Sequence, residues 1–129
     1  MQPISHYRNL TFLLLLLLLS LVVYWPAILG GYIMDDDIHL TDNAKLLQSW
    51  HGLWQIWRYP HITNVQYYPL TYTSFWIEYQ FWQLEPHGYH LVNVLLHALS
   101  AFVFWHILKL LQAPGAWFIA LVFVMHPIH

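Results

Sequence analysis

The sequence predicts an all-α membrane protein with about three transmembrane helices and one or two amphipathic interfacial helices in a large external loop. The 129 residues are 59% hydrophobic and only 8% charged, whereas a soluble domain carries about 25% charged residues. Apolar runs at residues 10–29, 89–111 and 115–126 alternate with more polar sequence. The chain has no cysteine, which excludes disulfides and thiolate metal sites. Its net charge of −2 gives no electrostatic basis for a nucleic-acid partner.

The first predicted span covers residues 10–29. Twenty helical residues extend about 30 Å, the thickness of a hydrocarbon core. Tyr24 and Trp25 mark its far interface, and Pro26 falls near its end. A cleaved signal peptide is the alternative, but residues 25–29 lack the small-residue cleavage pattern. We therefore expect a retained span.

The orientation of the chain follows from the positive-inside rule. Arg8 precedes the first predicted span, and Lys109 lies at the end of the second. All six acidic residues fall between Asp35 and Glu85. We therefore expect a cytoplasmic N-terminus and an external loop over residues 30–88.

The external loop itself contains helical patterns. Apolar residues at helical spacing predict a helix that starts near Thr41–Asn43 and ends before Pro60; they are Leu46, Leu47, Trp50, Leu53, Trp54 and Trp57. Three tryptophans on one stripe favour a helix lying in the membrane interface, with a core-facing amphipathic helix as the alternative. A second helix is predicted from Pro69 to Leu84, with aromatic residues on every side.

The last two spans form an antiparallel pair. The second span covers residues 89–111, and the turn at 112–115 (QAPG) returns the chain outward. The third span, 115–126, has room for only about 17 Å of helix. Its end is therefore expected in the outer half of the membrane or in a pocket that opens outward.

This topology brings polar residues from three segments to one external face. They are Asp35, Asp36 and Asp37 after the first span, His90, Asn93 and His97 along the second, and His126 and His129 closing the third. His90, Asn93 and His97 have the i, i+3, i+7 spacing of one helical stripe. Taken singly, an intramembrane His or Asn often bonds between helices, and the aspartates suit a solvated turn.

Four segments resemble, in the same order, motifs of the transmembrane and tetratricopeptide repeat-containing glycosyltransferases. Residues 31–37 (GYIMDDD) resemble the GF-V-W-DD opening of the family's first external loop, and residues 67–70 (YYPL) resemble its Y-R/Y-P-L motif. Residues 88–97 (GYHLVNVLLH) resemble GYHLVNxLLH, and residues 124–129 (VMHPIH) resemble A-x-HPxH. The third motif is long and specific. Tyr68 stands where many members have Arg.

The resemblance implies that residues 1–129 are an N-terminal fragment of a bacterial-type member of this family. The fragment would form an incomplete GT-C fold. It would lie in a bacterial inner membrane or an ER-like membrane. The later spans and the tetratricopeptide repeats would be absent, so we expect the fragment alone to be inactive. The family transfers a sugar, mannose in its characterised O-mannosyltransferases, from a polyprenyl-phosphate donor to a protein hydroxyl on the external side. The implied partners are membrane lipid, this lipid-linked donor and an acceptor protein.

The resemblance also implies the catalytic residues. In the GT-C fold an aspartate of the first external loop is the catalytic carboxylate, a role that carries over to Asp35 or Asp36. Such a carboxylate can act as general base toward the acceptor hydroxyl, while the leaving phosphate needs charge stabilisation. We place His90, Asn93, His97, His126 and His129 in the vicinity of the lipid phosphate. No cofactor is certain, although Asp35, Asp36 and Asp37 are candidate ligands for a divalent metal.

Three other classes remain open from the sequence. A non-catalytic membrane fragment or partner-binding module is the main alternative. A haem-binding cytochrome would use His97 and His126 as axial ligands. A metal transporter would need acidic or His residues at mid-membrane in several spans, and the first span has none.

Overall fold

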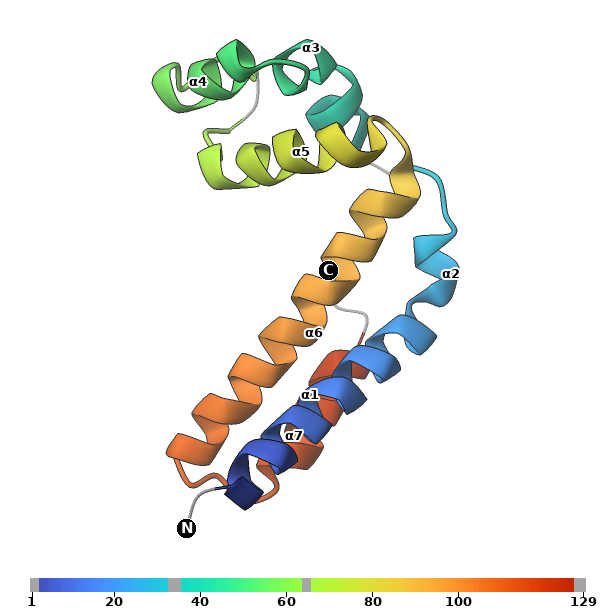
Figure 1. Cartoon of the computed structure of the whole chain (residues 1–129), viewed down its shortest axis with the longest axis vertical. Coiled ribbons are helices and arrows are strands. Elements are labelled where there is room, and N and C mark those ends of the chain that lie inside the picture. Colours follow the sequence, from blue (N-terminus) through green and yellow to red (C-terminus); the bar gives the residue numbers. More distant parts are fainter. Residues whose placement is uncertain (1–2, 33–35, 64–65, 127–129) are drawn as a thin grey trace. The chain divides into compact units, whose positions relative to one another are not determined.

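The computed structural model describes residues 3–32, 36–63 and 66–126, and every regular element within these ranges is a helix. In chain order they are α1 (Pro3–Val23), α2 (Trp25–Ile28), the π-helical turn η1 (Asp37–Thr41), α3 (Ala44–Leu47), α4 (Trp50–Arg58), α5 (Pro69–Trp82), α6 (Pro86–Leu110) and α7 (Ala116–Met125) (Figure 1). The predicted all-α class is therefore confirmed for the described residues.

The chain divides into two compact units. The first, here the apolar unit, consists of the described residues up to Leu29 and from His90 onward. The second, here the loop unit, consists of Gly30–Tyr89 and corresponds closely to the predicted external loop. The first turn of α6 belongs to the loop unit, and the remainder of α6 belongs to the apolar unit.

Side chains of α1, α6 and α7 pack together in the apolar unit, and among these helices the backbones of α1 and α7 approach most closely. Leu16 of α1, Ala101 of α6 and Val124 of α7 form one buried cluster. Trp105, Ala116 and Ala120 form a second cluster between α6 and α7. Small residues such as Ala120 of α7 are typical of helix interfaces in a membrane, and α7 is the helix whose backbone lies close to α1.

The helix of the first predicted span is interrupted once. α1 ends at Val23, and the short α2 continues from Trp25. Pro26 has no N–H and therefore cannot bond the carbonyl four residues earlier. The Tyr24 nitrogen still donates to the Ser20 carbonyl, and the Ile28 nitrogen to the Tyr24 carbonyl, both at 3.0 Å, so helical bonding resumes beyond the break.

Among the described residues, only α6 is long and apolar enough to cross a membrane. The stretches Tyr7–Val23 and Ala116–Met125 are also apolar but shorter. The structure thus supports one membrane span, and the other two remain predictions. α6 occupies Pro86–Leu110, beginning three residues before the predicted span.

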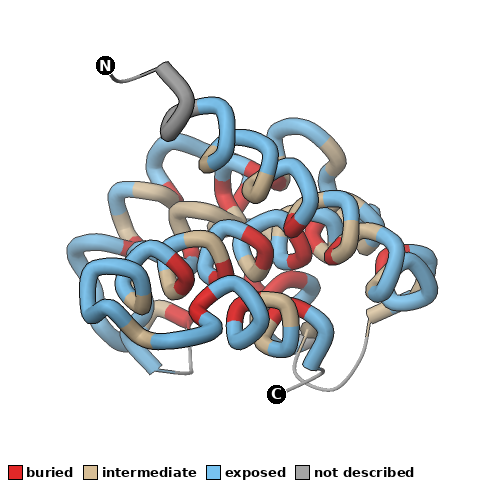
Figure 2. Tube along the Cα trace, turned by 90° about the horizontal axis from the view of Figure 1, so that it is seen from below, coloured by how far each residue is buried: buried red, intermediate tan, exposed pale blue. Residues whose placement is uncertain are grey.

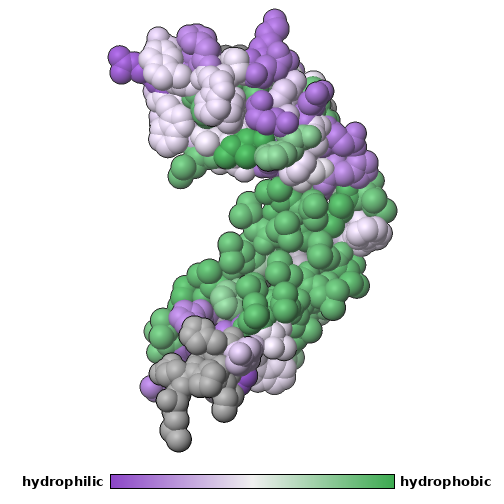
Figure 3. Space-filling view, viewed as in Figure 1, coloured by the Kyte–Doolittle hydropathy of each residue, from purple (hydrophilic) through white to green (hydrophobic). Residues whose placement is uncertain are grey.

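The outer surface of the apolar unit suits a non-aqueous surrounding. Figure 3 shows a nearly continuous hydrophobic face over its helices, and Figure 2 shows buried residues as short patches between long exposed stretches. Only 22% of the apolar window of α6 is buried. A core helix of a soluble protein would be mostly covered, since soluble monomers rarely expose large apolar patches.

The loop unit has its own aromatic core. Leu40, Leu47, Ile56, Tyr72, Trp76 and Tyr89 form one buried cluster in which η1, α3, α4, α5 and the first turn of α6 meet. α5 begins at Pro69, as predicted, because proline is favoured at the first helical position. Its end at Trp82 is followed by Gln83 with a positive φ of 53°.

The single helix predicted across residues 46–57 is in fact two helices, α3 and α4. Ser49 is extended, with φ −135° and ψ 154°, and its side chain accepts a hydrogen bond from the Gly52 nitrogen at 3.1 Å. Serine is a favoured N-cap because this bond satisfies a free N–H of the first turn. α4 ends at Arg58, before Pro60 as predicted.

The tryptophans of α4 lie largely outside the core, although the Trp50 ring packs 4.4 Å from the ring of the buried Trp76. Gly52 and Ile56 form the buried face of α4, whereas Trp50, Trp54 and Trp57 are at least half exposed. α4 thus packs on the core through Gly52 and Ile56, as the core-facing alternative expects, while its interfacial placement stays a prediction.

Candidate functional site

The acidic segment begins a tightly held turn in the loop unit. η1 begins at Asp37, Asp36 is the residue directly before it, and Asp35 lies outside the described residues. π-helical turns are rare and occur frequently at functional sites. Leu40, within the same turn, is only 2% exposed and belongs to the aromatic core. The buried leucine therefore fixes the backbone that carries Asp36.

Two side-chain contacts hold the turn downstream of Asp36. His39 Nδ1 lies 3.0 Å from the Tyr72 hydroxyl, and the Asn43 amide donates to the Ile38 carbonyl at 2.7 Å. Tyr72 and Asn43 are both buried. Buried hydrogen bonds of this kind define one backbone conformation, because breaking them leaves polar groups without water.

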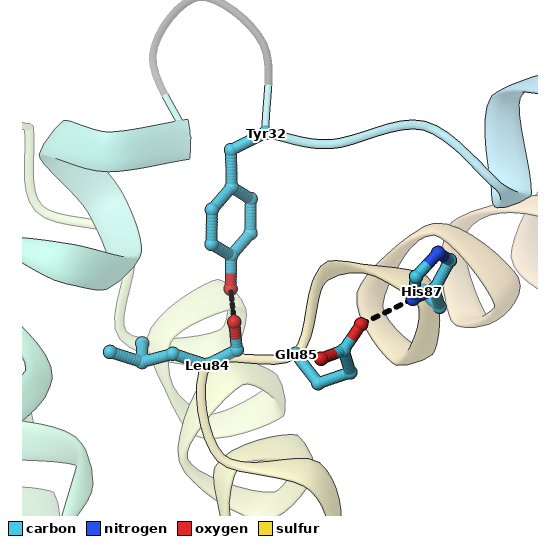
Figure 4. A network of polar contacts seen from close by, with 4 residues as sticks. All are labelled: Tyr32, Leu84, Glu85 and His87. Carbon is cyan, nitrogen blue, oxygen red and sulfur yellow. Dashed lines mark hydrogen bonds and ion pairs between the residues drawn. The ribbon is translucent and has the colours of Figure 1, made fainter.

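A further contact holds the chain upstream of the aspartates. The Tyr32 hydroxyl donates to the Leu84 carbonyl at 2.9 Å (Figure 4). Leu84 lies in the connection between α5 and α6, where the exposed Glu85 and His87 also form an ion pair (Figure 4). The chain is thus anchored at Tyr32 and again at His39, on either side of Asp36.

Glu78 is a buried acid that sequence reasoning did not assign to the site. Its side chain is 6% exposed, and its Oε1 accepts a hydrogen bond from the Ser74 hydroxyl at 2.7 Å. Burial raises the pKa of the Glu78 carboxyl, and the Ser74 bond partly opposes that rise. In the sequence, Glu78 stands out as the one charged residue within the predicted aromatic helix 69–84.

In the apolar unit, the polar stripe of α6 meets α7 and the end of α1. His97 Nε2 lies 3.2 Å from the Val124 carbonyl. Because a carbonyl only accepts, this nitrogen carries the proton. The His97 ring stacks on Phe123 with centroids 5.3 Å apart and meets Tyr24 edge-on at 5.5 Å. His97 therefore bridges the helices of this unit.

A small open cavity lies beside His97. It has a volume of about 140 Å³ and is lined by Tyr24, Asn93, Val94 and His97. The Tyr24 hydroxyl donates to the His126 carbonyl at 2.9 Å, which ties the end of α7 to this cavity. The exposed Asn93 places a side-chain amide at its wall. The cavity has room for a group of a few atoms, and its wall is mostly apolar.

The remaining predicted site residues are divided between the two units. His90 and the exposed His126 belong to the apolar unit with Asn93 and His97, and His129 lies outside the described residues. Asp36 belongs to the loop unit. The predicted gathering of both groups at one external face stays a prediction.

Neither metal nor haem binding gains support from the described residues. Within these ranges no group of three or more His, Asp or Glu side chains could hold a metal ion, although Asp35 is not among them. A haem beside His97 would need far more than the 140 Å³ found there, since cofactor pockets measure about 300–1,000 Å³. A larger cavity of about 540 Å³, lined by residues that include Arg8 and Trp117, contains none of the predicted site residues.

Comparison with known proteins shows which proteins this all-helical chain is similar to. Its relatives are proteins named protein O-mannosyl-transferases. No family model and no solved structure matches the chain.

Three relatives illustrate the similarity. Protein O-mannosyl-transferase TMTC3 of Homo sapiens is 30% identical over 114 residues, covering 82% of this chain and 12% of the relative. Protein O-mannosyl-transferase tmtc2 of Xenopus laevis is 33% identical over 120 residues, covering 86% and 14% respectively. Protein O-mannosyl-transferase F38B6.6 of Caenorhabditis elegans is 27% identical over 129 residues, covering 91% and 19%. The chain thus spans 12–19% of the length of these relatives. All three relatives are animal proteins, and the assignment to a bacterial-type member stays a prediction.

Proposed function

We propose that this chain belongs to the transmembrane and tetratricopeptide repeat-containing glycosyltransferases and forms the part of the enzyme that carries its catalytic carboxylate. One observation supports this most strongly. A match covering 82% of the 129-residue chain leaves about 23 residues unmatched. A contiguous match therefore includes both Asp36 and residues 88–97, whichever end it leaves out.

The proposed reaction transfers a sugar from a polyprenyl-phosphate donor to a hydroxyl of an acceptor protein. The Asp36 or Asp35 carboxylate accepts the proton of that hydroxyl as its oxygen bonds to the anomeric carbon. The bond from the anomeric carbon to the phosphate oxygen breaks, and its electron pair leaves with the polyprenyl phosphate. We infer that this phosphate lies in the vicinity of His90, Asn93, His97, His126 and His129, where hydrogen-bond donors can stabilise its charge.

The anchored turn suits this role because a general base must stay within hydrogen-bond reach of the proton it accepts. Leu40 in the core and the His39–Tyr72 contact hold the backbone three to four residues after Asp36. A misplacement of about 1 Å at such a group can cost about 100-fold in rate. The loop unit therefore serves as the rigid support of the carboxylate.

We propose that the loop unit is external and the N-terminus cytoplasmic. The Lys109 ammonium donates to the Asn9 side-chain oxygen at 3.3 Å and lies 4.3 Å from the centroid of the Trp105 ring. Asn9 directly follows Arg8 in the chain. Arg8 and Lys109, the two cations from which the orientation is predicted, therefore lie at one end of the apolar unit. The opposite end leads into the loop unit.

Substitution of the aspartates tests the catalytic assignment. Asp36→Asn and Asp35→Asn, made in the protein expressed from its complete gene, should lower sugar transfer by about 100-fold or more in at least one variant. Asp42→Asn is the matched control, because Asp42 is exposed in the same unit just after η1. Carbonate-resistant membrane insertion should persist in all three. Transfer at the wild-type rate by both Asp35→Asn and Asp36→Asn would remove the assignment.

A further inference from the structure

The cations of the apolar unit have no carboxylate side chain to pair with inside that unit. Arg8 and Lys109 are its only arginine and lysine. All six acidic residues of the chain fall between Asp35 and Glu85, in the loop unit. Any carboxylate or phosphate that neutralises these two cations therefore comes from outside the apolar unit.

Arg8 lines the larger cavity of the apolar unit, which has a volume of about 540 Å³. The cavity lies where the start of α1, the end of α6 and the start of α7 meet, and Figure 1 shows these three helix ends together. Ligand sites measure about 300–1,000 Å³. One wall is firmly packed, because the buried Trp105 ring lies against Phe12 with centroids 4.5 Å apart. The cavity is therefore large enough for part of a lipid molecule.

Each of the three helix ends contributes an amphipathic aromatic side chain to this cavity. They are Tyr7 of α1, Trp105 of α6 and Trp117 of α7. Tyrosine and tryptophan are enriched at the level of the lipid headgroups. The Lys109 ammonium lies at the same level, 4.3 Å from the centroid of the Trp105 ring. In a membrane, the aromatic and cationic end of the cavity therefore lies at headgroup depth.

The wall of the cavity changes from charged to apolar along α1. Tyr7 and Arg8 line its beginning, and Phe12 and Leu15 line it further along the helix. The seven residues from Arg8 to Leu15 advance about 10 Å along the helix axis. Thr11 lies between them, and its hydroxyl already donates to the Tyr7 carbonyl at 2.8 Å. This gradient matches a phospholipid whose phosphate lies at headgroup depth and whose acyl chain runs toward the bilayer centre.

We propose that this cavity binds one anionic glycerophospholipid, with its phosphate on the Arg8 guanidinium and one acyl chain along Phe12 and Leu15. A guanidinium holds a phosphate through two parallel hydrogen bonds, and Lys109 adds a second positive charge beside Trp105. Basic pockets between membrane helices on the cytoplasmic side are suited to anionic headgroups. The cavity shares no residue with the small cavity beside His97. The proposal requires the apolar unit to lie in a membrane and is independent of sugar transfer.

A phosphatidylglycerol probe with a photoactivatable diazirine on its acyl chain tests this proposal. The protein expressed from its complete gene would be reconstituted into phosphatidylcholine vesicles that contain a small fraction of the probe. After irradiation and digestion, mass spectrometry identifies the cross-linked residues. Phosphatidylcholine with the same diazirine chain measures the labelling that results from lipid contact alone. Since each cation near the membrane surface contributes about 1 kcal/mol toward an anionic lipid, we expect the phosphatidylglycerol probe to label residues 7–15 and 105–117 about tenfold more strongly.

Two variants separate the charged part of the site from the apolar part. Arg8→Gln should lower labelling by the phosphatidylglycerol probe about fivefold, and Arg58→Gln is the matched control, because Arg58 is an exposed arginine of the loop unit. Leu15→Trp places a large ring where the acyl chain would lie and should also lower labelling. Leu10→Trp is its control, because Leu10 lies about 140° from Leu15 around α1. Leu10 and Leu15 are 54% and 46% exposed, so neither substitution disturbs the core.

The proposal is overturned if the two probes label these residues equally, or if Arg8→Gln or Leu15→Trp is labelled as strongly as its control. Absence of labelling by both probes would show that another part of the protein covers the cavity, which also overturns it. Loss of labelling when inorganic phosphate replaces chloride at equal ionic strength would identify a site for a soluble anion instead of a lipid. Because sugar transfer is not measured, this test is independent of the aspartate variants.

Discussion

The hydroxyl of Tyr32 and the carbonyl of Leu84 are joined by a hydrogen bond of 2.9 Å across 52 residues of sequence. The bond links the chain that enters the acidic turn to the connection between α5 and α6 (Figure 4). Tyr32 also packs against Tyr89, with ring centroids 6.4 Å apart. The start of the proposed catalytic segment and the start of the candidate span are therefore anchored to the same place in the loop unit.

Tyr32→Phe should loosen this anchor while the ring packing remains. A lost hydrogen bond of this type costs about 1 kcal/mol, which corresponds to about fivefold faster amide exchange in residues 36–41 if the turn opens with the anchor. Hydrogen exchange in detergent micelles measures the effect. Tyr59→Phe is the control, because the exposed Tyr59 ring lies against Trp54 in the same unit. Equal exchange rates in wild type and Tyr32→Phe would show that the anchor does not hold the turn.

Gly52→Ala should destabilise the loop unit although alanine is the better helix former. The propensity gain is about 1 kcal/mol. A Cβ at position 52 would, however, lie 1.9 Å from the Leu46 carbonyl oxygen, and backbone atoms cannot rotate away. Overpacking of this kind costs typically about 1–3 kcal/mol, so we expect a net decrease in the thermal midpoint. Gly31→Ala is the matched control, because a Cβ there has nothing within 4 Å; a higher midpoint for Gly52→Ala than for wild type would contradict the packing of α3 on α4.

Glu78 should make the loop unit less stable as the pH rises. Burial raises the Glu78 pKa above its ordinary value of 4.5, so the unfolded chain releases this proton at a lower pH than the folded chain does. Stability is then unaffected well below pH 4.5, falls as the pH rises from that value to the raised folded pKa, and is constant above it. Thermal unfolding followed by tryptophan fluorescence between pH 4 and 8 should show this decline.

Two variants separate Glu78 from other titrating groups. Glu78→Gln retains the shape of the side chain and removes the titration, so its decline over the same pH range should be smaller than that of wild type. Ser74→Ala removes the hydrogen bond that lowers the Glu78 pKa, so its decline should be larger. Parallel pH profiles for all three proteins would mean that another group causes the decline.

Local sequence signals located the helix ends that involve proline. α5 begins at Pro69, and α4 ends at Arg58 shortly before Pro60. In both cases the fixed φ of proline and its missing N–H decide the boundary without help from distant residues. The long apolar run that became α6 was equally clear, because its length and composition are properties of the run alone.

Local sequence signals did not predict the break between α3 and α4, because the helical spacing of apolar residues continues across it. Distant side chains on α5 stabilise the break. The Gln80 amide donates to the Leu47 carbonyl and the Trp76 ring nitrogen donates to the Ser49 carbonyl, both at 2.9 Å. A continuous helix would bond the Leu47 carbonyl internally, so the two helices separate where Gln80 supplies its donor. The Ser49 carbonyl also accepts from the Leu53 nitrogen at 3.1 Å, as the first helical bond of α4.

The sequence by itself determined that the chain is apolar and helical, in what order its helices follow, and which polar residues stand near their ends. Composition, run length and proline chemistry act through neighbours in the chain, and they are readable there. Tertiary structure alone decided that Glu78 is buried, that the ends of three helices surround one cavity, and that Tyr32 and His39 anchor the chain around Asp36. Helical spacing specifies which residues share a face, but the helices that come to cover that face are contributed by segments dozens of residues away.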